Sequence, residues 1–130
     1  MNLTTASLLV AGTLIFGALF LAAANQDGGD PRPTNENVTA ENGTQVITIA
    51  AKGGYTPRAS VAKAGLATEL SIKTNNTFDC SSALVIPAVG YRQNLPVTGD
   101  TRVSVPPQQP GTTLRGLCTM GMYSFTVEFR

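Results

Sequence analysis

From Gln45 onward the sequence consists of short runs of β-forming residues separated by glycine and proline. Residues 67–74 alternate apolar and polar side chains, as a half-buried strand does, and residues 83–87 form an apolar run short enough for a core strand. Residues 123–129 place four apolar side chains on one face. No later stretch shows the 3.6-residue period of a helix. These runs predict an all-β fold, a Greek-key antiparallel β-sandwich formed by residues 45–130.

The N-terminal segment differs from the rest because it carries no charged side chain before Asp27. Residues 6–24 are almost entirely apolar, and as a helix they would span about 29 Å, close to the thickness of a bilayer core. A secretory signal peptide would carry a basic segment first, which this chain lacks, although Ala22 to Ala24 resemble a cleavage site. We therefore predict a retained single-pass transmembrane helix over residues 6–24, after a short tail of residues 1–5, with cleavage as the alternative.

Residues 25–44 are predicted to be a flexible linker between this anchor and the sandwich. Val38 is their only large apolar residue, so they bury too little surface to offset the entropy of ordering. Asp27 and Asp30 after the apolar segment, together with two cysteines in a small β domain, favour an extracytoplasmic C-terminal part. The predicted location is the cell membrane, with the C-terminal domain on its extracytoplasmic side.

The charge and composition exclude several classes of function. The formal net charge is +1 and no basic run occurs, so nothing favours a nucleic acid as partner. Histidine is absent, which removes the most common general base and the imidazoles of a blue-copper site. We therefore expect a monomeric binding protein and not an enzyme.

Apart from Met1, the sulfur-containing residues are gathered in two places. Cys118, Met120 and Met122 alternate near the C-terminus, so in an extended backbone they would share a face, and Cys80 is the other cysteine. Thiolates and thioethers together select Cu(I). The alternative is a disulfide between Cys80 and Cys118, which cysteine counting alone favours for an extracytoplasmic pair. Because a disulfide has no use for the two methionines, we interpret these four residues as metal ligands.

Several motifs together resemble a known family. They are Gly54-Tyr55-Thr56-Pro57, Val61 to Gly65, Cys80 followed by Leu84-Val85-Ile86-Pro87, Leu95-Pro96, and Cys118-Thr119-Met120-Gly121-Met122. With them, residues 45–130 resemble the cupredoxin-like domain of membrane-anchored Cu(I)-binding chaperones, which also occurs as a metal-binding module of some bacterial copper-exporting P-type ATPases.

The resemblance implies a cupredoxin fold and a Cu(I) site without histidine. Cys80 and Cys118 would hold the tighter-bound Cu(I), and Met120 and Met122 would complete a weaker, adjacent, solvent-facing position. Asp79 is a candidate supporting residue only because it adjoins Cys80, and its alternative is an exposed loop acid.

The expected function is a membrane-tethered Cu(I) chaperone or buffer that holds one or two Cu(I) ions, with Ag(I) binding as well. Its partner would be a copper-exporting P-type ATPase or another copper-handling protein in the same membrane. The alternative is a structural or adhesive extracytoplasmic β-sandwich stapled by a Cys80–Cys118 disulfide. A redox electron carrier is disfavoured because the chain has no histidine to ligate Cu(II).

Overall fold

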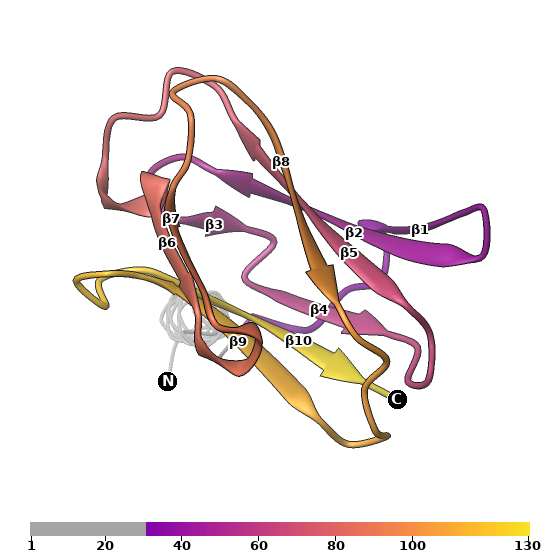
Figure 1. Ribbon diagram of the computed structural model, residues 1–130. Helices are drawn as coiled ribbons and strands as arrows, with labels where there is room; N and C mark the ends of the chain where they lie inside the picture. The colour runs from indigo at the N-terminus through magenta and orange to yellow at the C-terminus, as the bar shows by residue number, and fades with distance from the viewer. Residues whose placement is uncertain (1–30) are drawn as a thin grey trace, which may run out of the picture. The chain divides into compact units, whose positions relative to one another are not determined.

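Residues 31–130 are the part of the chain that this computed structural model describes, and they form ten strands and two short 3-10 turns (Figure 1). The predicted tail and transmembrane segment, residues 1–24, lie outside the described residues. Within residues 31–130 no helix is long and apolar enough to cross a membrane.

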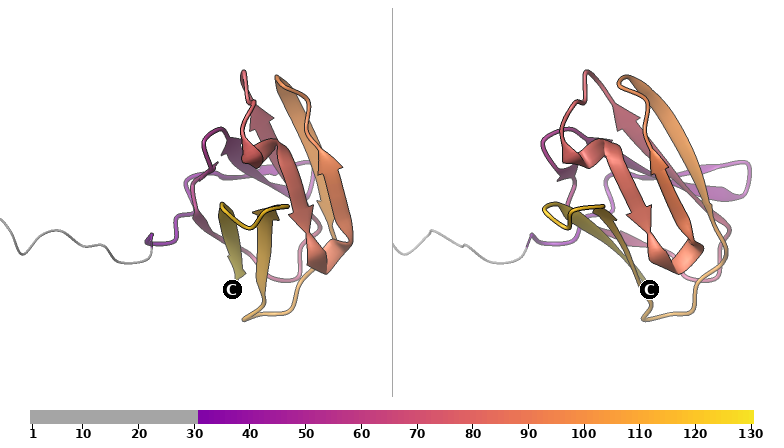
Figure 2. Two further views of the ribbon diagram at one scale, coloured as in Figure 1. Left: turned by 90° about the vertical axis from the view of Figure 1, so that its left-hand side faces the viewer. Right: turned by 60° about the vertical axis from the view of Figure 1, so that its left-hand side comes forward.

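The strands form two sheets that pack face to face (Figure 1). The first sheet has the order β1 (Val38–Glu41), β2 (Thr44–Ala51), β5 (Thr68–Thr74) and β8 (Gly99–Val105), with β3 (Tyr55–Thr56) also paired to β2. The second has the order β4 (Ala59–Ala62), β10 (Ser124–Phe129), β9 (Thr113–Cys118), β6 (Ala83–Ile86) and β7 (Tyr91–Asn94). The 3-10 turns η1 (Cys80–Ser82) and η2 (Pro87–Val89) flank β6. Figure 2 shows the C-terminus beside the β8–β9 connection, away from the turn of the β9–β10 hairpin.

The all-β architecture is confirmed, but the strand directions differ from the prediction at two places. β2 pairs with β5 in parallel, and β10 pairs with β4 in parallel, whereas every other pairing between named strands is antiparallel. For β2 and β5 the reason is that residues 52–67, which include β3 and, in the second sheet, β4, carry the chain back to the end at which β2 began. β5 therefore runs parallel to β2, and the sandwich is mixed and not purely antiparallel.

The sandwich also begins earlier than the sequence predicted. β1 lies within residues 25–44, the predicted linker, and pairs with β2 across a turn at Asn42 and Gly43. Both turn residues have positive φ angles, 50° and 80°, as a two-residue hairpin turn requires. Val38 packs against the core, so a single apolar residue and a favourable turn are enough to add this edge strand.

The core lies between the sheets, and β10 supplies its largest side chains. Phe125, Val127 and Phe129 are buried as the alternation predicted, whereas Tyr123 is only partly buried. The ring of Phe125 meets that of Tyr55 edge to face, with centroids 5.1 Å apart. Opposite Phe125 on β9 stands Gly116, and a Cβ there would lie 2.2 Å from the ring. The glycine therefore makes the space that the aromatic pair occupies.

Candidate metal centre

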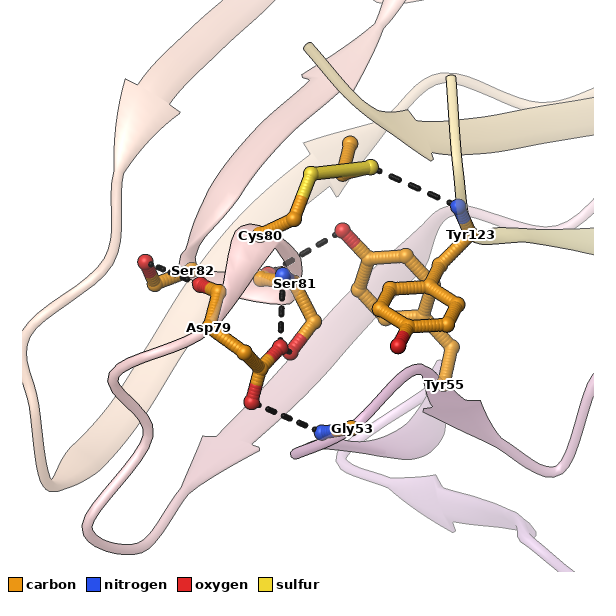
Figure 3. The surroundings of a disulfide bond; sticks show 8 residues. Gly53, Tyr55, Asp79, Cys80, Ser81, Ser82 and Tyr123 are labelled. Atoms are coloured by element: carbon orange, nitrogen blue, oxygen red, sulfur yellow. Dashed lines mark hydrogen bonds between the residues drawn. A yellow bond between two sulfur atoms is a disulfide. The ribbon is translucent and has the colours of Figure 1, made fainter. Parts of the chain in front are cut away.

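The β9–β10 hairpin and η1 bring the two cysteines together at one end of the sandwich. Cys118 ends β9, opposite Leu84 of β6, and the next backbone N–H, that of Thr119, donates to the carbonyl of Ala83. Cys80 begins η1, immediately before β6. Their Cα atoms are 5.8 Å apart, and the two sulfurs form a disulfide (Figure 3). The structure therefore places the cysteines together as predicted and pairs them in the way that the alternative interpretation expected.

The hairpin covers the Cys118 side of this pair. Cys118 is fully buried, and its Sγ accepts a hydrogen bond from the N–H of Tyr123 at 3.4 Å (Figure 3). The carbonyl of Cys118 accepts from the N–H of Gly121 at 2.8 Å, which closes a tight turn. Gly121 has a φ of 71°, a conformation that glycine adopts without a steric penalty. Cys80 is only partly buried, so this residue is the more exposed partner of the pair.

Met120 and Met122 lie in the loop of this hairpin, beside Cys118. They are 79% and 65% exposed, so neither is used to fill the core. The extended backbone that would have put them on one face with Cys118 is absent, because residues 119–123 form turns and bends. The loop nevertheless keeps both thioethers next to the cysteine pair in sequence and in direct contact with solvent.

Asp79 fixes the position of η1. Its Oδ1 accepts hydrogen bonds from the backbone N–H and the hydroxyl of Ser81, and its Oδ2 accepts one from the N–H of Gly53 at 2.8 Å (Figure 3). The hydroxyl of Ser81 and these two backbone donors hold the pKa of Asp79 below its usual value. Asp79 is therefore a cap that ties η1 to the β2–β3 loop and not merely an exposed loop acid. The Asp-x-Ser spacing is the local signal that predicts such a cap.

Tyr55 holds η1 from the side of the core. Its hydroxyl donates to the carbonyl of Ser81 at 3.0 Å (Figure 3). Its ring is buried and packs against Phe125. Burial, helped by the negative charge of Asp79, raises the pKa of Tyr55 to about 12, so the phenol stays protonated as a donor. Sequence reasoning included Tyr55 in a motif but gave it no role, because the contact with Ser81 joins residues 26 positions apart.

The donor atoms at this end suit a soft metal ion. Within residues 31–130 there is no cluster of three or more histidine, cysteine, aspartate or glutamate residues of the kind that holds a divalent ion. The four sulfurs offer two thiolates after reduction and two neutral thioethers, which is the donor type that Cu(I) prefers. The residues present therefore fit the group that the resemblance implies.

Comparison with known proteins identifies the family. The family model of the cupredoxin-like domain matches residues 12–128. The chain belongs to the cupredoxin-like family. The resemblance seen in the sequence is thereby confirmed. No curated protein matches this cupredoxin-like chain significantly.

Two solved structures share the fold. The metal-binding domain of the Cu(I)-exporting P-type ATPase CopA of Streptococcus pneumoniae D39, determined with Cu(I), superimposes with a TM-score of 0.66 at 21% identity. That match covers 78% of this chain and 99% of the other. A copper-binding protein determined by NMR in the apo form also gives a TM-score of 0.66, at 25% identity, and covers 75% of this chain and 98% of the other. The matches cover nearly all of both solved chains, and residues 31–130 form one compact unit of this chain.

Proposed function

We propose that this cupredoxin-like domain binds Cu(I) through Cys80 and Cys118, with Met120 and Met122 as weaker outer ligands. The protein would act as a copper chaperone or buffer and not as an enzyme. Residues 6–24 would tether it to the cell membrane with residues 31–130 on the extracytoplasmic side. One or two Cu(I) ions would be held, and Ag(I) would bind in their place because it is equally soft.

One observation carries this proposal. Every sulfur atom of residues 31–130 lies either in η1 or in the β9–β10 hairpin, at the same end of the sandwich. The copper-binding proteins that share the fold support the same assignment. A core that used methionine as packing material would not leave both thioethers exposed beside the only two cysteines.

The Cu(I)-binding form is the reduced one. A dithiol reductant supplies two electrons and two protons, which convert the disulfide into two thiols while the reductant is oxidised to its own disulfide, and each thiol releases its proton when it binds the metal. The Cα separation of 5.8 Å that allows the disulfide also lets both sulfurs reach one ion. Because Asp79 and Tyr55 hold η1, the Cys80 side of the site is already in place before the metal arrives.

Release would proceed by ligand exchange. Thioethers are neutral and bind Cu(I) less tightly than thiolates, so the exposed Met120 and Met122 can give way to the thiolates of an acceptor. Cys80, partly exposed, would exchange next, and the buried Cys118 last. The acceptor would be a copper-exporting P-type ATPase or another copper-handling protein in the same membrane.

A second candidate function rests on the disulfide itself. A Cys80–Cys118 bond that persists in the mature protein would make the domain a structural or adhesive module displayed from the membrane. The bond joins residues 38 positions apart, and a loop of that length corresponds to about 4 kcal/mol of stabilisation in the chain-entropy model. This function needs no metal and leaves the two methionines without a role.

A competition titration distinguishes the two functions. Residues 31–130 are reduced without oxygen and titrated with Cu(I) against a chromophoric Cu(I) chelator, alongside the Cys80→Ser and Cys118→Ser variants. The proposal predicts one or two equivalents held by the parent and loss of the tight equivalent in both variants. Failure of the fully reduced parent to compete with the chelator would leave the structural function as the better one.

A further inference from the structure

Three cationic side chains near the sulfur-bearing loops have no ion-pair partner within residues 31–130. Lys52, Arg58 and Arg92 form no ion pair with any residue of the described part of the chain, residues 31–130. Arg58 lines a hollow of about 430 Å³ together with Met122 and Tyr123. Arg92 lines a second hollow, of about 280 Å³, together with Thr119. Two of the cations therefore border the β9–β10 loop, and Lys52 lies in the β2–β3 loop next to Gly53, which binds Asp79.

The acidic side chains do not compensate these cations. Asp100 pairs with Lys73, Glu41 and Glu69 lie within reach of Arg102, and Glu128 pairs with Arg130. Glu36 precedes β1 and lies toward the C-terminal end of β2, because the carbonyl of Asn37 accepts from the N–H of Thr48. Asp79 lies at the sulfur-bearing end, and its oxygens are already bonded within the loops. Even when Glu36 is counted at this end, three cations against two carboxylates leave an excess of positive charge.

The same loops carry three exposed apolar side chains. Phe78 and Met120 are each 79% exposed and Met122 is 65% exposed, and Phe78 lies two residues before Cys80. Protein interfaces usually combine apolar side chains with polar and charged ones. We call this surface the sulfur end and define it by Phe78, Met120, Met122, Lys52, Arg58 and Arg92.

We propose that the sulfur end docks an acidic surface that surrounds the Cu(I)-accepting thiolates of the partner. The inference rests on the proposed function and adds the charge of the acceptor. Complementary charge steers encounter and raises association rates by about 10-fold to 1,000-fold at low ionic strength. Because Arg58 and Arg92 line hollows together with Met122 and Thr119 of the hairpin loop, an acceptor steered by these cations arrives with its thiolates close to the methionines.

An anionic membrane surface is the competing occupant, and the geometry favours the protein. Three cations would contribute only about 3 kcal/mol to binding an anionic bilayer. A bilayer over the sulfur end would also cover Met120 and Met122 instead of presenting them to another thiolate.

The test uses two synthetic acceptors with the same Cys-x-x-Cys core, one flanked by four glutamates and the other by four lysines. Residues 31–130 are loaded with Cu(I), and transfer to each peptide is followed by stopped-flow spectroscopy at low salt and at about 0.5 M salt. We expect transfer to the acidic peptide to be at least about 10-fold faster at low salt, with the difference largely lost at high salt. The Arg58→Glu/Arg92→Glu variant should reverse the preference.

Lys63→Glu is the matched control. Lys63 also forms no ion pair within residues 31–130, but it follows β4 and lines a different hollow, with Leu66 and Arg130, toward the C-terminal end of β10. Its variant should keep the preference for the acidic peptide. All three substituted side chains belong to exposed residues, and circular dichroism verifies that each variant is folded.

Each other outcome overturns the inference at a recognisable step. Retained Cu(I) with equal transfer rates to both peptides would exclude the docking surface and leave the proposed function intact. Failure of the parent to retain Cu(I) would remove the proposed function, and the docking surface with it. A third outcome would assign the sulfur end to the membrane. In that case the parent sediments with phosphatidylserine vesicles, the Arg58→Glu/Arg92→Glu variant does not, and the parent transfers Cu(I) to both peptides at the same rate.

Discussion

Substitution of Gly116 by alanine should disturb the core and, through it, the site. A Cβ at Gly116 would lie 2.2 Å and 2.3 Å from two ring carbons of Phe125, whereas ordinary contacts begin at 3.4 Å. The ring must therefore retreat by about 1 Å in a core that is packed as densely as a crystal. Phe125 meets Tyr55 edge to face, and Tyr55 donates to the carbonyl of Ser81, so the displacement reaches η1 and Cys80.

The expected cost follows from these contacts. Overpacking costs about 1–3 kcal/mol, and loss of the edge-to-face geometry with Tyr55 adds up to about 1.5 kcal/mol. Gly116 does not have a positive φ, so alanine also restricts the unfolded chain and returns about 0.4–1 kcal/mol. The sum is a loss of about 2 kcal/mol in the free energy of unfolding, measured by urea denaturation of residues 31–130 with circular dichroism.

Two comparisons make this prediction strict. Gly99→Ala is the matched control, since Gly99 also lacks a positive φ and its added Cβ would meet only the tip of Pro96 at 3.2 Å. In a Phe125→Leu background the clash is relieved, so Gly116→Ala should cost at least about 1 kcal/mol less there than in the parent. Equal costs for the two glycines, together with no coupling to Phe125, would refute the packing argument.

Three further predictions concern the supports of the site. Tyr55→Phe should lower the free energy of unfolding by about 1–2 kcal/mol at pH 7, because the buried carbonyl of Ser81 loses its donor. The folded-state pKa of Tyr55 is about 12, above the usual value of 10, so the parent should lose stability as the pH rises from 10 through 12. The Tyr55→Phe variant should not show this loss of stability between pH 10 and pH 12, because it has no phenol to ionise. If urea unfolding gives the same dependence of stability on pH for the variant and the parent, the raised pKa of Tyr55 is contradicted. Asp79→Ala should lower the free energy of unfolding by about 0.5–2 kcal/mol, and Asp79→Asn should lower it less because asparagine remains a good cap. Equal midpoints for the two variants in thermal melts would contradict this prediction. Reduction of the Cys80–Cys118 bond should lower the free energy of unfolding by about 4 kcal/mol. Denaturant titrations with and without a dithiol reductant measure this difference, and equal midpoints would mean that the bond does not constrain the unfolded chain.

Local patterns predicted the parts of the fold that depend on local structure. The alternation in residues 123–129 predicted the buried face of β10, because the period of a strand is a property of a single segment. The Asn42-Gly43 pair is also a local turn signal, which the prediction of a linker over residues 25–44, based on low hydrophobicity alone, did not use. The parallel pairing of β2 with β5 could not be predicted, since it depends on where the chain goes between them.

The candidate site likewise has features that follow from local sequence and features that depend on contacts between distant segments. The spacing of Cys118, Met120 and Met122 and the presence of Cys80 predicted one sulfur site, and of these residues the structure joins the two cysteines and leaves the methionines exposed in the adjoining loop. The turn at Gly121 replaced the expected extended backbone, so the methionines lie in a loop instead of on a strand face. The support that Tyr55 gives to η1 joins segments 26 residues apart and has no signature in either segment alone.

X-ray absorption at the copper edge of the Cu(I)-loaded, reduced protein tests the proposed site most directly. The nearest shell should contain only sulfur scatterers, and their number should fall in the Cys80→Ser and Cys118→Ser variants. The Met120→Leu/Met122→Leu variant should keep the thiolate contribution and lose the weaker scatterers. A shell dominated by oxygen or nitrogen, or one unchanged when both cysteines are replaced, would show that copper is held elsewhere and not by Cys80 and Cys118.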